Sequence, residues 1–297
     1  MKKISGTHIS NTIIEELRLE VLALKEKNII PTLAVVLVGD DPASKIYVNN
    51  KKKACAKIGI KSEEIILSAD ISQQELLNVI DKLNNDISVH GILCQLPLPS
   101  HINEKIIVER IDPNKDIDGI HPLNLGRLCM GNAGTPGTPI QSFFYPCTPL
   151  GVLEILKRSN IKIAGSHIVV VGRGPTIGRP LSIMLSLKGM DATVTICHSK
   201  SANIKEITKM ADILIAAIGV PKFITRDFVK EGAVVIDVGI NRSSDNRSND
   251  KIVGDVDYDD VYEKVSAITP VPGGVGPMTV AMLMYNTVRA CEKKFPL

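Results

Sequence analysis

The stretch from Ile168 to Pro180 constrains the fold of this chain more than any other. Four β-branched apolar residues end at Gly172, two more glycines follow at Gly174 and Gly178, and apolar residues then recur at helical spacing. A strand, a glycine turn and a helix in this order form the first half of a βαβ unit, in which a phosphate can reach the amides at the helix N-terminus. The Gly-x-Gly-x-x-x-Gly spacing is one residue longer than the common dinucleotide fingerprint, so an ordinary strand-to-helix turn is the alternative.

The next predicted strand, residues 192–197, indicates which dinucleotide this unit prefers. In NAD-binding units, an acidic residue near the end of this strand usually bonds the ribose hydroxyls. Here the strand is followed by His198, Ser199 and Lys200, and Arg173 lies in the glycine turn. Cationic and hydroxyl groups suit a 2′-phosphate, so the sequence favours NADP over NAD. The alternative is that Arg173 and Lys200 are simply solvated.

The composition excludes several classes of protein. The chain has 297 residues, enough for two domains, and its hydrophobic content of 44% and charged content of 23% are ordinary for a soluble globular protein. Its net charge of +3 is too balanced to indicate a nucleic acid or a membrane as a partner. No signal peptide or membrane span is expected. The six scattered cysteines predict reduced thiols of a cytoplasmic protein, with neither a disulfide frame nor a zinc site.

A separate α/β domain is expected before the glycine turn. Residues 31–39 indicate a strand buried on both faces, and two further strands are predicted at 64–67 and 89–96, with helices between them. Regular patterning is lost over 112–147. A loop of this length, especially its segment 130–145, is usually functional or disordered.

The pattern after the glycine turn continues the strand and helix alternation. Strands are predicted at 212–219 and 233–238, and a last helix from residue 278 is expected to pack on the first domain. The acidic run 255–260 has no further ligands clustered around it, so a solvated turn is favoured over a metal site.

Five polar residues of the first domain stand out. Tyr47 and Lys51 are four residues apart in a predicted helix, and therefore share one face. Gln95 lies in an apolar predicted strand, and Asp116 and Asp118 precede a glycine. A lone helical lysine is usually a solvated charge and a lone strand glutamine is often a satisfied core amide, so spacing alone assigns them no function.

Segments along essentially the whole chain carry a family signature. They are Val38 to Lys51, Gly91 to Pro99, Pro113 to His121, Asn124 to Leu128, Pro146 to Pro149, Asp237 to Asn241 and Thr269 to Thr279. Together they resemble the bifunctional methylenetetrahydrofolate dehydrogenase / methenyltetrahydrofolate cyclohydrolase family. The chain departs from the family at Gly174, where many members have serine, and in the 130–145 loop, which is longer than in compact members.

The resemblance implies both a fold and a reaction. The fold is α/β, with a folate-binding catalytic domain at 1–147, completed by a C-terminal helix at 277–297, facing a Rossmann-type NADP-binding domain at 148–276 across a cleft. The reaction is NADP-dependent oxidation of 5,10-methylenetetrahydrofolate to methenyltetrahydrofolate, followed by hydrolysis to 10-formyltetrahydrofolate. The resemblance further implies a homodimer and no metal requirement.

The resemblance also implies roles for individual residues. Lys51 would be the general base or hydrogen-bond partner of the attacking water, and Gln95 would hold Lys51. Tyr47 would stack on the folate and bond Lys51. Asp118 would accept two hydrogen bonds from the pterin, and Asp116 would either contact the substrate or cap a local turn. Pro272, Gly273 and Gly274 would line the folate site, and NADP would contact Gly172, Arg173, Gly174, Gly178, His198, Ser199 and Ile240.

Three rival functions stay open from the sequence. A monofunctional dehydrogenase of the same family would lack the hydrolytic step, which Lys51 and Gln95 argue against. A two-domain amino-acid dehydrogenase would need a cation for the substrate carboxylate and no acid placed for a pterin. A non-catalytic NADP-sensing module would not depend on Lys51.

Overall fold

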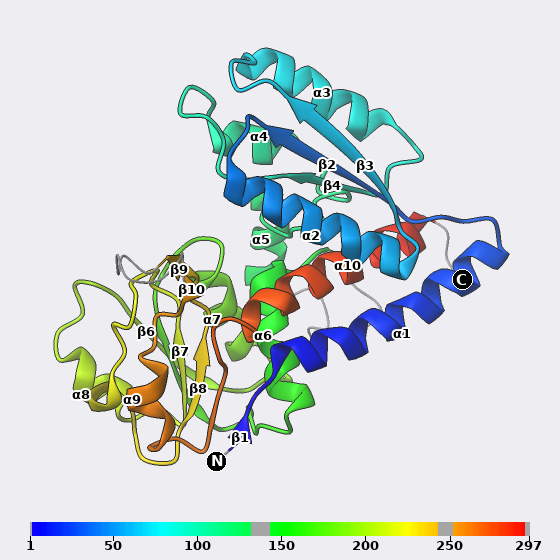
Figure 1. Cartoon of the computed structure of the whole chain (residues 1–297). Helices are drawn as coiled ribbons and strands as arrows, with labels where there is room; N and C mark the ends of the chain where they lie inside the picture. The colour runs from blue at the N-terminus through cyan, green and yellow to red at the C-terminus, as the bar shows by residue number, and fades with distance from the viewer. Residues whose placement is uncertain (1, 132–142, 243–251, 295–297) are drawn as a thin grey trace. The chain divides into compact units, whose positions relative to one another are not determined.

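The chain forms two compact α/β units, named here by the size of their sheets. The computed structural model describes residues 2–131, 143–242 and 252–294 (Figure 1). The six-stranded unit comprises residues 2–10 and 148–279, and the three-stranded unit comprises residues 11–131, 143–147 and 280–294, within those described ranges. Two parallel-sheet units confirm the α/β class.

The limits of the units differ from the expected domain limits at the chain's beginning. The first ten residues were expected in the domain 1–147, but strand β1 (Lys2–Lys3) pairs in parallel with β11 (Ala267–Ile268) of the six-stranded sheet. Two residues carry no hydrophobic pattern that could identify a strand in the sequence. Helices α1 (Gly6–Glu26) and α10 (Val275–Lys294) each have residues in both units.

The six-stranded sheet is parallel throughout, and its strand order reverses at the strand that precedes the glycine turn. From β5 (His167–Val171) the chain passes to β6 (Thr193–Cys197) on one side, and then to β7 (Ile213–Ala216) on the other. Strand β8 (Val234–Asp237) follows β7, and β11 and β1 complete the order. Ligands of doubly wound sheets bind at the carboxyl ends of the strands where this reversal occurs, which here is beside the turn at Gly172.

Short helices and loops complete the six-stranded unit. One core cluster packs the sheet residues Val169, Leu214 and Val235 against Phe228 and Val261. Successive residues of β5 and β7 are buried, as expected where both faces of a parallel sheet are covered. The helical segments are α6 (Cys147–Arg158), α7 (Gly178–Ser186), α8 (Ile204–Thr208), the 3₁₀ turn η1 (Arg226–Phe228) and α9 (Tyr258–Tyr262), and β9 (Asn241–Arg242) pairs antiparallel with β10 (Ile252–Val253).

The three-stranded sheet has the apolar strand β2 (Thr32–Val38) at its centre. It pairs in parallel with β3 (Lys61–Leu67) on one side and β4 (Gly91–Cys94) on the other. All seven residues of β2 are buried, as expected for a strand covered on both faces. Alternate residues of β2 pack against α3 (Gln73–Asn85) and α4 (Glu104–Arg110). Helix α2 (Pro42–Ile58) also packs against the sheet.

Side chains cap two helices of the three-stranded unit. Ser72 and Glu75 form a capping box at the start of α3, and Asn103 caps α4. Ser10 lies inside α1, where its hydroxyl donates to the carbonyl oxygen of Thr7. Within the stretch expected to be irregular, α5 (Pro122–Cys129) forms with His121 as its N-cap. A helix of that length gives little periodicity to detect in a sequence. In the described part of the chain, no helix is long and apolar enough to cross a membrane.

Candidate functional site

Helix α2 presents Tyr47 and Lys51 on one face, as the sequence predicts. The helix starts sharply because the Asp41 carboxylate accepts a hydrogen bond of 2.7 Å from the amide of Ser44. It ends where Gly59 adopts a left-handed conformation. Tyr47 is 40% exposed, and no hydrogen bond joins it to Lys51 in the described structure, although the family resemblance implied one.

Gln95 holds the Lys51 ammonium directly. Lys51 Nζ donates to Gln95 Oε1 over 2.8 Å, while Gln95 Nε2 donates to the carbonyl oxygen of Leu96 over 2.7 Å. These contacts fix both ends of the amide, so its oxygen faces the lysine. Gln95 was expected within a strand, but β4 ends at Cys94 and Gln95 is the next residue, with its backbone amide still bonded to Val36. Parallel strands of the α/β class usually carry functional residues at this end.

Lys51 and Asp118 influence each other's charge. Burial lowers the pKa of Lys51 below that of an ordinary lysine, and the Asp118 carboxylate opposes this shift. Burial raises the pKa of Asp118, and Lys51 opposes that shift in turn. The site therefore contains an amine that loses its proton more readily than usual, together with a partly desolvated carboxyl group.

Asp116 is built into the turn that precedes α5. It is 2% exposed and accepts hydrogen bonds of 2.8 Å from Asn124 Nδ2 and from the amide of His121. A longer bond of 3.3 Å comes from the amide of Ile120. Burial raises the pKa of Asp116 to about 7. Through these contacts Asp116 stabilises a local turn, which is one of the two roles that the resemblance implied for it.

Cys147 and Asn286 contact the backbone next to Asp118, and no role was expected for either residue from the sequence. Cys147 Sγ donates to the carbonyl oxygen of Ile117 over 3.2 Å, and it interacts with the Asp118 carboxyl group. Asn286 Nδ2 donates to the carbonyl oxygens of Ile117 and Tyr145 over 2.8 and 3.1 Å. An asparagine in an apolar stretch of the last helix was the only sequence signal for this contact.

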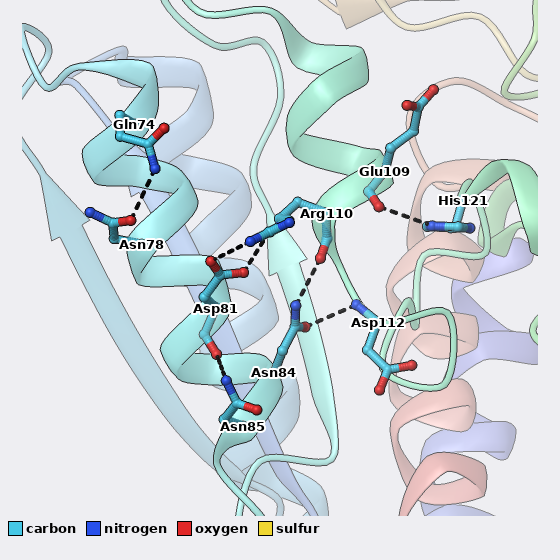
Figure 2. A network of polar contacts seen from close by, with 9 residues as sticks. All are labelled: Gln74, Asn78, Asp81, Asn84, Asn85, Glu109, Arg110, Asp112 and His121. Carbon is cyan, nitrogen blue, oxygen red and sulfur yellow. Dashed lines mark hydrogen bonds and ion pairs between the residues drawn. The ribbon is translucent and has the colours of Figure 1, made fainter.

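The segment that leads to Asp116 and Asp118 is anchored to helix α3 by polar contacts. Figure 2 shows the Arg110 guanidinium on the Asp81 carboxylate, at 2.6 and 2.7 Å, and Asn84 bonded to the backbone of Arg110 and Asp112. Lys115 Nζ then donates to three carbonyl oxygens at the end of α3, which belong to Leu83, Asn84 and Asp86. The backbone around Asp118 is thus fixed independently of any ligand.

The glycine turn after β5 requires glycine at two of its three positions. A side chain at Gly172 would collide with the carbonyl oxygen of Ala217, and the φ of Gly172 is +129°. A side chain at Gly178 would collide with the carbonyl oxygen of Gly172. A Cβ at Gly174 would meet no atom within 4 Å, which leaves open space above the turn. No side-chain cap bonds the first amides of α7. A turn with three glycines and no side-chain cap at its helix fits a dinucleotide phosphate.

The residues expected to select NADP emerge at the same edge of the sheet as the glycine turn. Val171 pairs with Cys197 in register, and the Gly172 amide donates to the Cys197 carbonyl oxygen over 2.8 Å. Arg173 and Ser199 are both exposed beside this junction. His198 is half-buried, and its Nδ1 accepts a hydrogen bond of 3.1 Å from the amide of Lys200.

The loop at residues 272–274 has a close backbone contact with the beginning of α1. The Thr7 amide donates to the carbonyl oxygen of Gly273 over 3.1 Å, and Gly273 has a φ of +96°. A side chain at Gly274 would collide with the Pro270 carbonyl oxygen. These glycines have a local structural reason, and the contact of Pro272, Gly273 and Gly274 with folate stays a prediction.

The acidic run 255–260 was expected to be a solvated turn, but its first residue, Asp255, is not solvated. Asp255 is fully buried and accepts hydrogen bonds from backbone amides that follow β7. The burial of Asp255 could not be predicted from the sequence, because these amide donors lie more than 30 residues away in the chain. Asp259 and Asp260, in α9, follow the expectation of exposure more closely.

Comparisons with known proteins agree with one another. Residues 4–118 match the family model "Tetrahydrofolate dehydrogenase/cyclohydrolase, catalytic domain", and residues 146–295 match its NAD(P)-binding domain. A "Bifunctional protein FolD" from Acetivibrio thermocellus is 52% identical, over 98% of this chain and 97% of that protein.

Two solved structures are similar over nearly the whole chain. The bifunctional enzyme FolD from Campylobacter jejuni has a TM-score of 0.92 and 47% identity, covering 99% of this chain and 100% of that one. FolD from Trypanosoma brucei, solved with NADP and an inhibitor, has a TM-score of 0.91 and 35% identity, covering 99% of this chain and 98% of that one.

Proposed function

We propose, since the chain belongs to the tetrahydrofolate dehydrogenase/cyclohydrolase family, that it catalyses two consecutive reactions of one-carbon metabolism. The first oxidises 5,10-methylenetetrahydrofolate to 5,10-methenyltetrahydrofolate, and the second hydrolyses this product to 10-formyltetrahydrofolate. The observation that carries the proposal is the Lys51–Gln95 hydrogen bond of 2.8 Å beside the Asp118 carboxyl group, because it provides a positioned amine for the hydrolytic step.

Lys51 is the proton-transfer group of the hydrolysis in this proposal. Water that attacks the methenyl carbon must lose a proton, and a neutral amine accepts it. The lowered pKa of Lys51 enlarges the fraction of neutral amine at a given pH, and Gln95 keeps the nitrogen in place. Asp118 binds the amino-pyrimidinone edge of the pterin through two hydrogen bonds, and Tyr47 packs on the substrate. These residues require no metal for their roles.

NADP⁺, when bound, supplies the hydride acceptor of the oxidation. The residues that fit it are the glycine turn with Gly172, Gly174 and Gly178, and the exposed Arg173 and Ser199 beside it. The turn offers its amides to the pyrophosphate, and Arg173 offers a cation to the 2′-phosphate. His198 and Ile240 complete the set that we propose for the dinucleotide.

Arg173→Ala is expected to weaken the binding of NADP⁺ more than that of NAD⁺. The substitution removes a charge-assisted bond that only the 2′-phosphate can use, a loss of about tenfold in affinity. Titration of both nucleotides against both proteins measures the difference. Arg179→Ala is the matched control, since Arg179 is an exposed arginine in the first turn of α7. Equal weakening of both nucleotides by Arg173→Ala would refute the role.

A monofunctional dehydrogenase is the nearest alternative, and hydrolysis can be tested without the oxidation. Methenyltetrahydrofolate is supplied to the protein in the absence of NADP⁺, and the loss of its chromophore is followed. Consumption well above the buffer rate supports the second activity. Consumption at the buffer rate would mean that the protein catalyses only the oxidation. Lys51 and Gln95 would then have no hydrolytic role.

A homodimer joined at the free edge of the three-stranded sheet completes the proposal. Strand β3 pairs only with β2 among the described strands, and Ile66 on β3 is 66% exposed. A strand edge that is open to pairing and that exposes an apolar side chain is a ready partner for a second copy. We expect light scattering to give a dimer for the parent chain and a monomer for Ile66→Lys. Ile87→Lys, at a turn residue that is 78% exposed, is the control. A monomeric parent, or a dimeric Ile66→Lys, would contradict this interface.

A cytoplasmic location is part of the same proposal. All six cysteines keep their thiols unbridged by a disulfide, and five of them are buried. Free thiols are typical of a reducing compartment.

A further inference from the structure

Asp255 is a fully buried carboxylate that joins two turns at the carboxyl edge of the six-stranded sheet. Its Oδ2 accepts hydrogen bonds from the amides of Ile218 and Gly219, over 2.7 and 3.0 Å. Its Oδ1 accepts from Asn241 Nδ2 over 2.9 Å. The first pair of partners follows β7, and Asn241 begins β9, four residues after β8 ends at Asp237. One side chain therefore bonds both turns.

A second buried carboxylate holds Asp255 itself in position. Asp237 Oδ1 accepts hydrogen bonds from the amides of Gly239 and Asp255, over 3.0 and 2.9 Å, and its Oδ2 accepts from Val256 over 3.0 Å. Side chains at Gly239 and Gly254 would collide with the carboxylates of Asp255 and Asp237 respectively. Two carboxylates are buried here because each is supplied with several N–H donors.

The two turns that Asp255 joins lie at the same sheet edge as the glycine turn, because they follow β7 and β8, the next two strands beside β5. Val171 pairs with Ala216, and Ala216 pairs with Asp237, so the segments that follow these strands emerge side by side. Ala217 donates its amide to Val171 over 2.8 Å, and its carbonyl oxygen occupies the place of a side chain at Gly172. This is the edge at which the strand order reverses and where doubly wound sheets bind their ligands.

We propose that Asp255 is a positioning residue for the dinucleotide, acting through the turns at Ile218–Gly219 and Gly239–Asn241. Ile240, which lies between Gly239 and Asn241, is 48% exposed and is the residue of that turn available to a ligand. Asp255 touches no ligand in this account. It fixes the relative position of the two turns beside the glycine turn, and the inference rests on the proposed dehydrogenase function.

Exchange of the Asp255 and Asn241 side chains tests the inference. Asn241→Asp alone places two carboxylates at hydrogen-bond distance, and we expect the Kd for NADP⁺ to rise about tenfold or more. Asp255→Asn in the same chain restores one donor facing one carboxylate, and we expect Kd to return to within about threefold of the parent. Calorimetric titration of NADP⁺ measures Kd, and thermal unfolding is recorded for each protein. Asp227→Asn is the control, because this carboxylate of the same unit is 67% exposed.

The rate of hydrolysis of supplied methenyltetrahydrofolate without NADP⁺ distinguishes a positioning role of Asp255 from a general loss of protein stability. We expect Asn241→Asp to change this rate far less than it changes the Kd for NADP⁺, because the proposed hydrolytic residues belong to the other unit. If Asn241→Asp does not fold, the milder Asn241→Ala replaces it, with an expected rise in Kd of about threefold to tenfold.

Three outcomes would overturn the inference while the parent still binds NADP⁺. They are an unchanged Kd in the single variants, an exchange variant as weak as Asn241→Asp, and a hydrolysis rate that falls in parallel with nucleotide affinity. A parent chain that neither binds NADP⁺ nor forms NADPH would instead contradict the proposed function.

Discussion

Lys51→Met is expected to lower the rate of methenyltetrahydrofolate hydrolysis by about 10²-fold to 10⁴-fold, the usual contribution of a positioned acid or base. Methionine has a similar length but cannot accept the proton of the attacking water. Gln95 already holds Lys51 Nζ at 2.8 Å, so the amine is positioned before the substrate arrives. The rate is measured from the loss of the methenyl chromophore at saturating substrate, with the folded state checked by thermal unfolding.

Two further variants define what the lysine does. Lys52→Met is the matched control, because the neighbouring side chain is 58% exposed and forms an ion pair of 2.7 Å with Glu64. We expect its hydrolysis rate to stay within about twofold of the parent, since surface ion pairs contribute little. Lys51→Arg keeps the charge but cannot lose its proton, so a base role predicts that it is as slow as Lys51→Met. A fast Lys51→Met protein would contradict the assignment.

The pH dependence of hydrolysis carries the same information. Because the pKa of Lys51 lies below that of an ordinary lysine, the neutral amine forms at lower pH. The rate of the parent therefore rises with pH and levels off once Lys51 is neutral, below the pH at which a solvent-exposed lysine would lose its proton. The pH profile of Lys51→Met, corrected for the buffer reaction, is expected to lack this rise of the rate with pH. If the rate of that variant rises with pH as the parent's does, the titrating group is not Lys51.

Gly178→Ala is expected to abolish measurable NADP⁺ binding and to destabilise the six-stranded unit. A methyl group at this position collides with the Gly172 carbonyl oxygen, which is backbone and cannot rotate away. The Gly172 amide is bonded to the Cys197 carbonyl oxygen, and the φ of Gly172 is +129°, a value that other residues rarely adopt. The turn therefore has little freedom to adjust. Forced overpacking of this kind lowers the free energy of unfolding by about 1–3 kcal/mol. Thermal unfolding and nucleotide titration measure the two effects.

Gly174→Ala provides the comparison within the same turn. A Cβ there meets no atom within 4 Å, and the residue does not need a positive φ. We expect its melting temperature to equal that of the parent within about 2 °C, the shift caused by a few tenths of a kcal/mol. Equal destabilisation by the two alanines would show that the turn is not constrained as the structure indicates.

Local sequence patterns predicted the features that depend on neighbouring residues. The strand, glycine turn and helix around Gly172 require only a hydrophobic run and three glycines, and the structure has β5, the turn and α7 there. The placement of Tyr47 and Lys51 on one helix face follows from their spacing of four.

Features that depend on distant residues could not be predicted in this way. Asp255 looked like part of an acidic surface turn, because the amides that make its burial possible belong to Ile218 and Gly219, more than 30 residues earlier in the chain. Asn286 meets the backbone of Ile117 across 169 positions of the chain. The family resemblance supplied the roles of Lys51 and Asp118 and the contact of Gln95 with Lys51, but it did not indicate the contacts of Cys147 and Asn286 with the segment around Asp118.

The most direct measurement follows NADPH and the methenyl chromophore together in one reaction that starts from methylenetetrahydrofolate and NADP⁺. If one chain carries both activities, NADPH rises while methenyltetrahydrofolate accumulates only slightly, and added methenyltetrahydrofolate disappears faster than in buffer. Build-up of methenyltetrahydrofolate in equal amount to NADPH would contradict the account, since the Lys51–Gln95 pair would then have no hydrolytic function.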